Sequence, residues 1–209
     1  MLNSNERVRM HDAVIFVWDG TLADTKFVVV TAFQKALGEI DCNVSDRFVE
    51  RRIGIGAKGT LVEALKATNT PFTDEKIEEL AEMKIEAQIQ LSKAVNLFEG
   101  ARDLLRFLYG RIKIALGSMS SRKVVDKLLN EKRIVKYFDV VITADEVLHP
   151  KPNPEVFLKC ARMLNCFPEK CVVIEDSIFG VKAAKEAGIE CVAIPSGAYS
   201  EEELRKKES

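Results

Sequence analysis

The feature that most constrains the fold is a continuous apolar run, AVIFVW at residues 13–18, which ends abruptly at Asp19 and Gly20. A run that is apolar at every position, rather than at alternate ones, is typical of a strand buried on both faces within a parallel sheet. Similar segments with β-branched residues follow at residues 112–118, 139–145, 171–177 and 191–195. We therefore predict five strands of one parallel sheet.

Segments with the helical spacing of apolar residues separate these strands. Pro154 suits the first turn of one such helix, and Gly188 suits the C-terminal cap of another. Strands that alternate with helices in this way form a right-handed α/β sheet. The predicted fold class is therefore α/β with a Rossmann-like parallel sheet. The predicted helices span residues 101–108, 121–130, 154–165 and 178–187.

The alternation is interrupted by residues 24–96, where the pattern is helical throughout. We predict that this segment is an inserted α-helical domain and that residues 1–23 and 97–209 form the α/β core. The short connections at residues 22–25 and 93–97 are candidate hinges.

The clearest helix of the insert runs from Thr73 to about Ser92, with Thr73 as its N-cap. Ile77, Leu80 and Lys84 fall on an amphipathic surface, and a solvated outer face would account for the charged residues of this helix.

Composition narrows the class of partner. The 31 lysines and arginines nearly balance the 32 aspartates and glutamates, so there is no overall electrostatic reason to expect nucleic acid or a membrane surface. We expect a cytoplasmic monomer or weak dimer that binds a small molecule, with no signal peptide or membrane span. The five cysteines are odd in number and mostly lie in apolar patterns, which favours reduced thiols over disulfides.

Polar residues gather where the predicted strands end. Ligands of open α/β sheets bind beyond the carboxyl ends of the strands, so these residues are expected to converge. Carboxylates in such a place suit magnesium, and a hydroxyl with a lysine suits phosphate oxygens. The pattern predicts phosphoryl transfer. The strand-end residues are Asp19, Gly20, Thr21, Ser118, Met119, Ser120, Lys151, Glu175 and Asp176.

Each of these residues also has a purely structural interpretation. Asp19 with Gly20 can form a tight turn, Ser118 can cap a helix, and Lys151 can lie on an exposed loop. Their placement together at four strand ends favours the functional interpretation.

Four segments resemble the signatures of the haloacid dehalogenase superfamily, in the same order. They are IFVWDGTLADT, GSMSS, HPKPNPEVF and VVIEDSIFGVKAA. The β-phosphoglucomutase-like group is the most similar, because it places a small helical cap between the first two signatures. The resemblance covers nearly the whole chain and implies Mg²⁺-dependent chemistry on a small phosphorylated metabolite through an aspartyl-phosphate.

The resemblance also implies roles for individual residues. Asp19 would act as general acid and base, and its backbone carbonyl would bind magnesium with Glu175 and Asp176. Ser118 and Lys151 would bind the transferring phosphoryl group, in a phosphate and substrate site that also includes Gly20, Thr21 and Met119.

The chain departs from the family pattern at Val17, which occupies the position of the nucleophilic aspartate. Valine has neither a lone pair to attack phosphorus nor an oxygen to bind magnesium. Loss of a nucleophile lowers turnover by on the order of 10⁶ in a serine protease, so we predict that this chain is nearly inactive. The retention of Asp19, Lys151 and Asp176 favours a recent or deliberate replacement over an ancient non-catalytic protein.

The predicted substrate loop at residues 52–59 carries three glycines and Lys58, which could bind a second anionic group or could simply be solvated. Sugar-phosphate mutases of the group carry a lysine and an arginine where this chain has Ile53 and Ala57. We therefore rank a phosphatase above a mutase, and keep a non-catalytic phospho-ligand binding protein as a third hypothesis.

Overall fold

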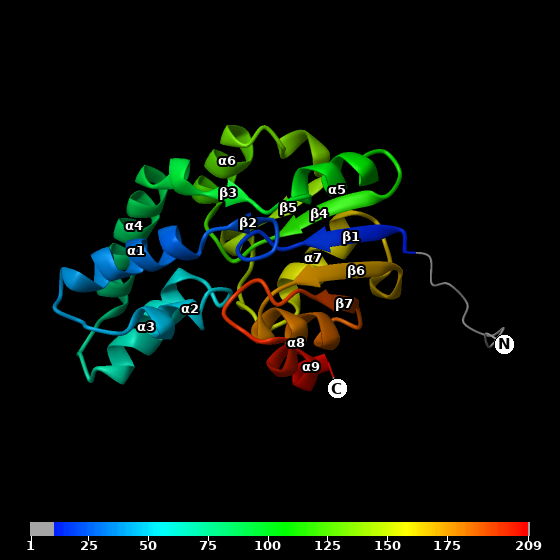
Figure 1. Cartoon of the computed structure of the whole chain (residues 1–209). Coiled ribbons are helices and arrows are strands. Elements are labelled where there is room, and N and C mark those ends of the chain that lie inside the picture. Colours follow the sequence, from blue (N-terminus) through cyan, green and yellow to red (C-terminus); the bar gives the residue numbers. More distant parts are fainter. Residues whose placement is uncertain (1–10, 209) are drawn as a thin grey trace.

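The apolar run at the start of the chain forms the central strand of a five-stranded sheet in the order β5-β4-β1-β6-β7 (Figure 1). All neighbouring strands of this sheet are parallel, as predicted. The structure is a computed structural model and describes residues 11–208. The strands are β1 (Ala13–Phe16), β4 (Lys113–Gly117), β5 (Val140–Ile142), β6 (Cys171–Glu175) and β7 (Glu190–Ala193).

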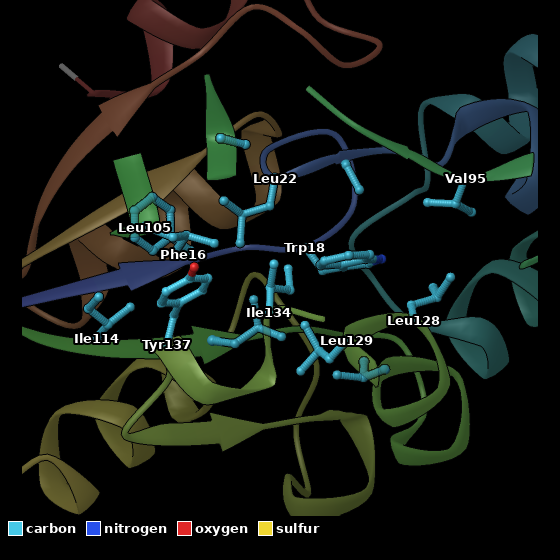
Figure 2. Close-up of a cluster of buried hydrophobic side chains, with 14 of the residues drawn as sticks. Phe16, Trp18, Leu22, Val95, Leu105, Ile114, Leu128, Leu129, Ile134 and Tyr137 are labelled. Carbon is cyan, nitrogen blue, oxygen red and sulfur yellow. The ribbon is translucent and has the colours of Figure 1, made fainter. Parts of the chain in front are cut away.

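Alternate residues of β1 and of the positions just after it pack into two different apolar clusters, one on each face of the sheet. Val14, Phe16 and Trp18 pack with residues of helices α5 and α6 on one face of the sheet (Figure 2). Ala13, Ile15 and Val17 pack with α7 and α8 on the other face. Burial on both faces explains why the run is apolar at every position. The helices of the core are α5 (Ala101–Leu108), α6 (Arg122–Glu131), α7 (Glu155–Met163), α8 (Ile178–Glu186) and α9 (Glu201–Glu208).

A helical insert, defined here as residues 26–94, lies beside the sheet (Figure 1). Both of its connections to the core pass through a two-stranded antiparallel ribbon, in which Ala23 pairs with Leu97. Most buried apolar residues of the insert form a cluster of their own, whereas Val28, Ile85 and Ile89 pack with the cluster that contains Trp18. The ribbon strands are β2 (Ala23–Asp24) and β3 (Asn96–Leu97), and the helices of the insert are α1 (Lys26–Gly38), α2 (Asp46–Glu50), α3 (Ala57–Ala67) and α4 (Asp74–Gln90).

Short 3₁₀ turns complete the described elements. They are η1 (Ser92–Ala94), η2 (Val135–Tyr137), η3 (Ala144–Glu146) and η4 (Pro168–Lys170). The hydroxyl of Thr73 accepts a hydrogen bond from the Lys76 N–H, so it caps α4 as predicted. All five cysteines are free thiols, which also agrees with the sequence. Among residues 11–208, no helix is both long enough and apolar enough to cross a membrane.

Two neighbouring leucines of α5 allow a test of this packing. Leu105 is fully buried against the sheet, whereas Leu104 is 44% exposed. We expect Leu105→Ala to lower the free energy of unfolding by about 2–5 kcal/mol, because it leaves a cavity in the core. Leu104→Ala should change it by about 0.5 kcal/mol or less. Urea unfolding of both variants measures the difference, and equal effects would contradict the described packing of α5.

Candidate active site

Asp19 lies just beyond the carboxyl end of β1, where two hydroxyl groups hold its carboxylate. The Thr25 hydroxyl donates to Oδ1 at 2.7 Å, and the Ser120 hydroxyl donates to Oδ2 at 2.8 Å. Thr25 belongs to the connection to the helical insert, whereas Ser120 follows β4. The side chain is nearly buried, and these two donors fix its orientation.

Val17 lies two residues before Asp19 and is buried. Its backbone N–H donates to the carbonyl of Ile174 at 3.2 Å, which continues the pairing of β1 with β6. Its side chain joins the apolar cluster that contains Met119 and Ile142. The side chain at position 17, next to the polar residues at the carboxyl end of β1, is therefore a buried hydrocarbon.

Lys151 and Glu175 form an ion pair that is almost completely withdrawn from solvent. The Lys151 Nζ lies 2.8 Å from Glu175 Oε1, and the two side chains are 0% and 1% exposed. Glu175 Oε2 accepts hydrogen bonds from the backbone N–H groups of Asp176 and Ser177. Removing one partner of such a pair leaves an uncompensated buried charge, which costs about 3–5 kcal/mol.

Asp176 packs closely against backbone that contains two glycines. A Cβ atom added at Gly20 or at Gly197 would lie 2.0 Å from Asp176 Oδ2, so neither position has room for a side chain. The Thr21 hydroxyl donates to Asp176 Oδ1 at 3.3 Å. Burial, and next the negative charge of Glu175, raise the pKa of Asp176 well above its usual range.

The predicted metal ligands are the Asp19 backbone carbonyl and the side chains of Glu175 and Asp176. Among residues 11–208, no group of three or more His, Cys, Asp and Glu side chains is placed to hold a metal ion. Both oxygens of Glu175 already have partners, as described above. In this geometry the Glu175 carboxylate binds the Lys151 ammonium. The role of Glu175 as a metal ligand stays a prediction.

The helical insert lines the opposite side of the same site. A small cavity of about 20 Å³ is lined by core residues that include Asp19, Met119 and Ser120, and by insert residues that include Arg52 and Lys84. Apolar side chains make up much of the remaining wall. The structure thus brings the strand-end residues under α3 and α4, and the space between them has room for about one water molecule.

Lys84 is the residue of this cavity that the sequence interpretation placed wrongly. The sequence predicts that the charged residues of this helix lie on a solvated face, but Lys84 is only 4% exposed. Its Nζ donates to the Gln88 side-chain oxygen and lies 5.0 Å above the ring of Phe33. Burial lowers the pKa of Lys84 to about 8, against the opposing effect of the Asp19 charge. In the described part of the chain, Lys84 pairs with no carboxylate.

Lys58 lies elsewhere. It is exposed, forms an ion pair with Glu78 of α4 and does not line the cavity. Arg52 does line the cavity, although it also pairs with Glu63. The cation that faces Asp19 from the insert is thus Lys84, and the signal for it was a lysine at a helical position otherwise occupied by apolar residues.

Comparison with known proteins agrees with this arrangement. Residues 14–194 match the family of haloacid dehalogenase-like hydrolases, and the chain belongs to that family. A phosphorylated carbohydrates phosphatase of Thermotoga maritima is 32% identical over 180 residues, which cover 86% of this chain and 82% of that protein. The fructose-1-phosphate phosphatase YqaB of Escherichia coli is 30% identical over 189 residues, covering 87% and 95%.

A solved structure supports the same class. The crystal structure of β-phosphoglucomutase from Clostridium difficile has a TM-score of 0.82 with this chain at 27% identity, and the match covers 95% of this chain and 97% of that one. The fold and the family are therefore those of the β-phosphoglucomutase-like haloacid dehalogenase enzymes.

The buried Lys84 should leave a signature in the dependence of stability on pH. The lowering of its pKa from 10.5 to about 8 corresponds to about 3 kcal/mol of stability lost at pH 7, at 1.36 kcal/mol per pH unit. Between pH 8 and 10.5 the unfolded chain holds more protons than the folded one, so this cost disappears as the pH rises. Relative to Lys84→Met, the native chain should gain about 2 kcal/mol between pH 7 and pH 10.

Urea unfolding of both proteins at a series of pH values measures this gain. The difference between the two proteins cancels the titration of all other groups. A difference that stays constant from pH 7 to pH 10 would show that Lys84 is not desolvated in the folded protein.

Proposed function

We propose that this chain is the nucleophile-deficient form of a magnesium-dependent phosphatase for a small phosphorylated carbohydrate or related metabolite. The observation that carries the proposal is the geometry around Asp19, which Ser120 and Thr25 orient beside the buried Lys151 and Asp176. The similarity to two phosphatases supports hydrolysis, and their names support a sugar phosphate. Val17 stands where the reaction requires a carboxylate, and on this proposal the chain as written turns over very slowly.

The residues that match the family pattern would each have a separate role in the reaction. Asp19 would give a proton to the leaving oxygen of the ester and then take one from the attacking water. Lys151 and the Ser118 hydroxyl would bind the oxygens of the phosphoryl group, and Gly20, Thr21 and Met119 would shape the surrounding wall. Because Glu175 fixes the Lys151 ammonium, this positive charge is in place before the substrate arrives.

Magnesium fits the donor atoms at this edge of the sheet. Asp176 offers a buried carboxylate that, among residues 11–208, accepts one side-chain hydrogen bond, from the Thr21 hydroxyl, and the Asp19 backbone carbonyl offers a second oxygen. When bound, the ion would neutralise charge on the phosphoryl oxygens. Val17 contributes no oxygen, so we expect the affinity of this chain for Mg²⁺ to be lower than that of an aspartate variant.

We propose that residues 24–96 act as a cap over the site and that Lys84 contacts the part of the substrate beyond the phosphoryl group. Lys84 reaches the cavity from α4, opposite Asp19. A lysine without a carboxylate partner is a strong donor to sugar hydroxyls or to a second anionic group. We also propose the cytoplasm as the compartment, because the five free thiols persist in a reducing environment.

Two other functions remain in view. A sugar-phosphate mutase is supported by the similarity to β-phosphoglucomutase, but Ile53 and Ala57 offer no charge to hold a second phosphate. A phospho-ligand binding protein is supported by Val17. It would bind a sugar phosphate and would gain no activity when an aspartate is introduced.

Restoring the carboxylate tests the proposal directly. We expect Val17→Asp to release phosphate from p-nitrophenyl phosphate and from hexose phosphates in the presence of Mg²⁺, at a rate at least 10³-fold above the native chain. Val17→Asn is the matched control, because it is similar in size and polarity but is a poor nucleophile. If the folded aspartate variant releases no phosphate from any of these esters, the phosphatase proposal is overturned, and a mutase or a binding protein is favoured.

The role of Lys84 can be separated from that of Lys58. In the Val17→Asp background, Lys84→Met should raise the KM for a sugar phosphate by about 10-fold or more, because it removes a buried donor worth about 1.5–3 kcal/mol. Lys58→Met should leave the KM nearly unchanged, because Lys58 pairs with Glu78 on the outside of the insert. Equal effects of the two substitutions would contradict the assignment of Lys84.

A further inference from the structure

The helical insert is bound to the far end of the chain through Arg51, a residue outside the cavity. Arg51 Nη2 lies 2.7 Å from Glu203 Oε1, at the start of α9. Its guanidinium carbon lies 4.5 Å above the ring of Tyr199. The Tyr199 hydroxyl donates to the backbone carbonyl of Arg51. One residue of the insert is therefore held by both its side chain and its backbone.

These contacts are stronger together than an ion pair on the surface. Both charged side chains are only partly exposed, at 33% for Arg51 and 39% for Glu203, and Tyr199 is buried. An isolated pair with this exposure contributes little to stability, but a charged planar group that also stacks on a ring is held in one geometry. The Ser200 N–H donates to the second oxygen of Glu203 at 3.0 Å, so both partners of the pair are pre-oriented.

The same segment of chain also contacts the catalytic edge of the sheet. The Ser196 hydroxyl donates to the carbonyl of Gly20, and Gly197 packs against the carboxylate of Asp176. Residues 196–203 thus run from the strand ends to the insert, and Figure 1 shows this loop reaching from β7 toward the insert before α9 begins. Arg51 directly precedes Arg52, Ile53 and Gly54, which line the cavity above Asp19.

We propose that Arg51, Tyr199 and Glu203 are positioning residues that hold the helical insert closed over the site. We call them the C-terminal latch. By fixing Arg51, the latch sets the distance of the loop at residues 52–56 from Asp19, and so controls how tightly a substrate is enclosed. The insert is joined to the core by the ribbon of β2 and β3, and α4 packs against α6 on the other side of the insert. The contacts of Arg51 are therefore the ones that hold the part of the insert next to the loop at residues 52–56.

The latch can be tested by amide hydrogen exchange, which requires neither turnover nor a substrate. We expect Glu203→Gln and Tyr199→Phe each to speed exchange at residues 51–56 by about 3-fold or more. Glu202→Gln is the matched control, because Glu202 lies on the same helix and pairs with Lys206 of that helix at 2.7 Å. The control should exchange as the native chain does. Unchanged exchange at residues 51–56, or equal acceleration in the control, would overturn the proposal.

A charge swap distinguishes a latch from simple loss of structure. Arg51→Glu and Glu203→Arg should each speed exchange in the loop, and the double variant should restore at least part of the native protection. In the Val17→Asp background, Glu203→Gln should raise the KM by about 3-fold or more and change kcat less. Because exchange is measured without catalysis, an inactive Val17→Asp variant would overturn the proposed phosphatase and leave the test of the latch intact. Failure of the double variant to recover protection would overturn the latch.

Discussion

The burial of β1 on both faces is the constraint on which the rest of this structure depends. A strand whose every side chain leaves water must have helices on both sides and a hydrogen-bonded strand at each edge, and β1 has all four neighbours. With parallel neighbours, the carboxyl ends of β1, β4 and β6 meet at one edge. Asp19, Ser120 and Glu175 are therefore brought together by the same packing that stabilises the core.

The chemistry at this edge depends on charges that are costly to bury. Lys151 and Glu175 are tolerated because they pair and because backbone N–H groups satisfy the second oxygen of Glu175. Among the described residues, the partners of Lys84 are an amide oxygen and an aromatic ring, and burial lowers the pKa of its ammonium group. Such groups persist when a protein trades stability for a site that is ready to bind a charged ligand.

The site is completed by two parts of the molecule, the α/β core and the helical insert. The core supplies Asp19 and the side chains proposed to bind phosphate, while the insert supplies the cavity wall that carries Lys84. The two parts are joined by a short ribbon, so contacts beyond it determine how they meet. Arg51 is one such contact, and the C-terminal segment that holds it also touches Gly20 and Asp176. A change at residues 196–203 can in this way reach Gly20 and Asp176 at the carboxyl edge of the sheet.

The sequence by itself determined the sheet, the insert and the residues at the strand ends. Apolar runs without alternation predict buried parallel strands, and a break in the strand and helix pattern marks the insert, because both are local patterns. It also determined that Val17 stands beside Asp19, since the motif is contiguous.

Only the tertiary structure decided that Lys84 lines the cavity. It also decided that the hydroxyls of Thr25 and Ser120 both donate to the carboxylate of Asp19. The carboxylate of Glu175 accepts hydrogen bonds from Lys151 and from backbone N–H groups, and this too depends on the tertiary structure. It likewise decided that Lys58 faces outward and that Arg51 meets Glu203 across 152 positions of sequence. Sequence periodicity shows which side of a helix is apolar, but not which neighbour that side meets. Contacts between distant segments depend on how the insert and the core pack, and this is the physical reason they could not be predicted.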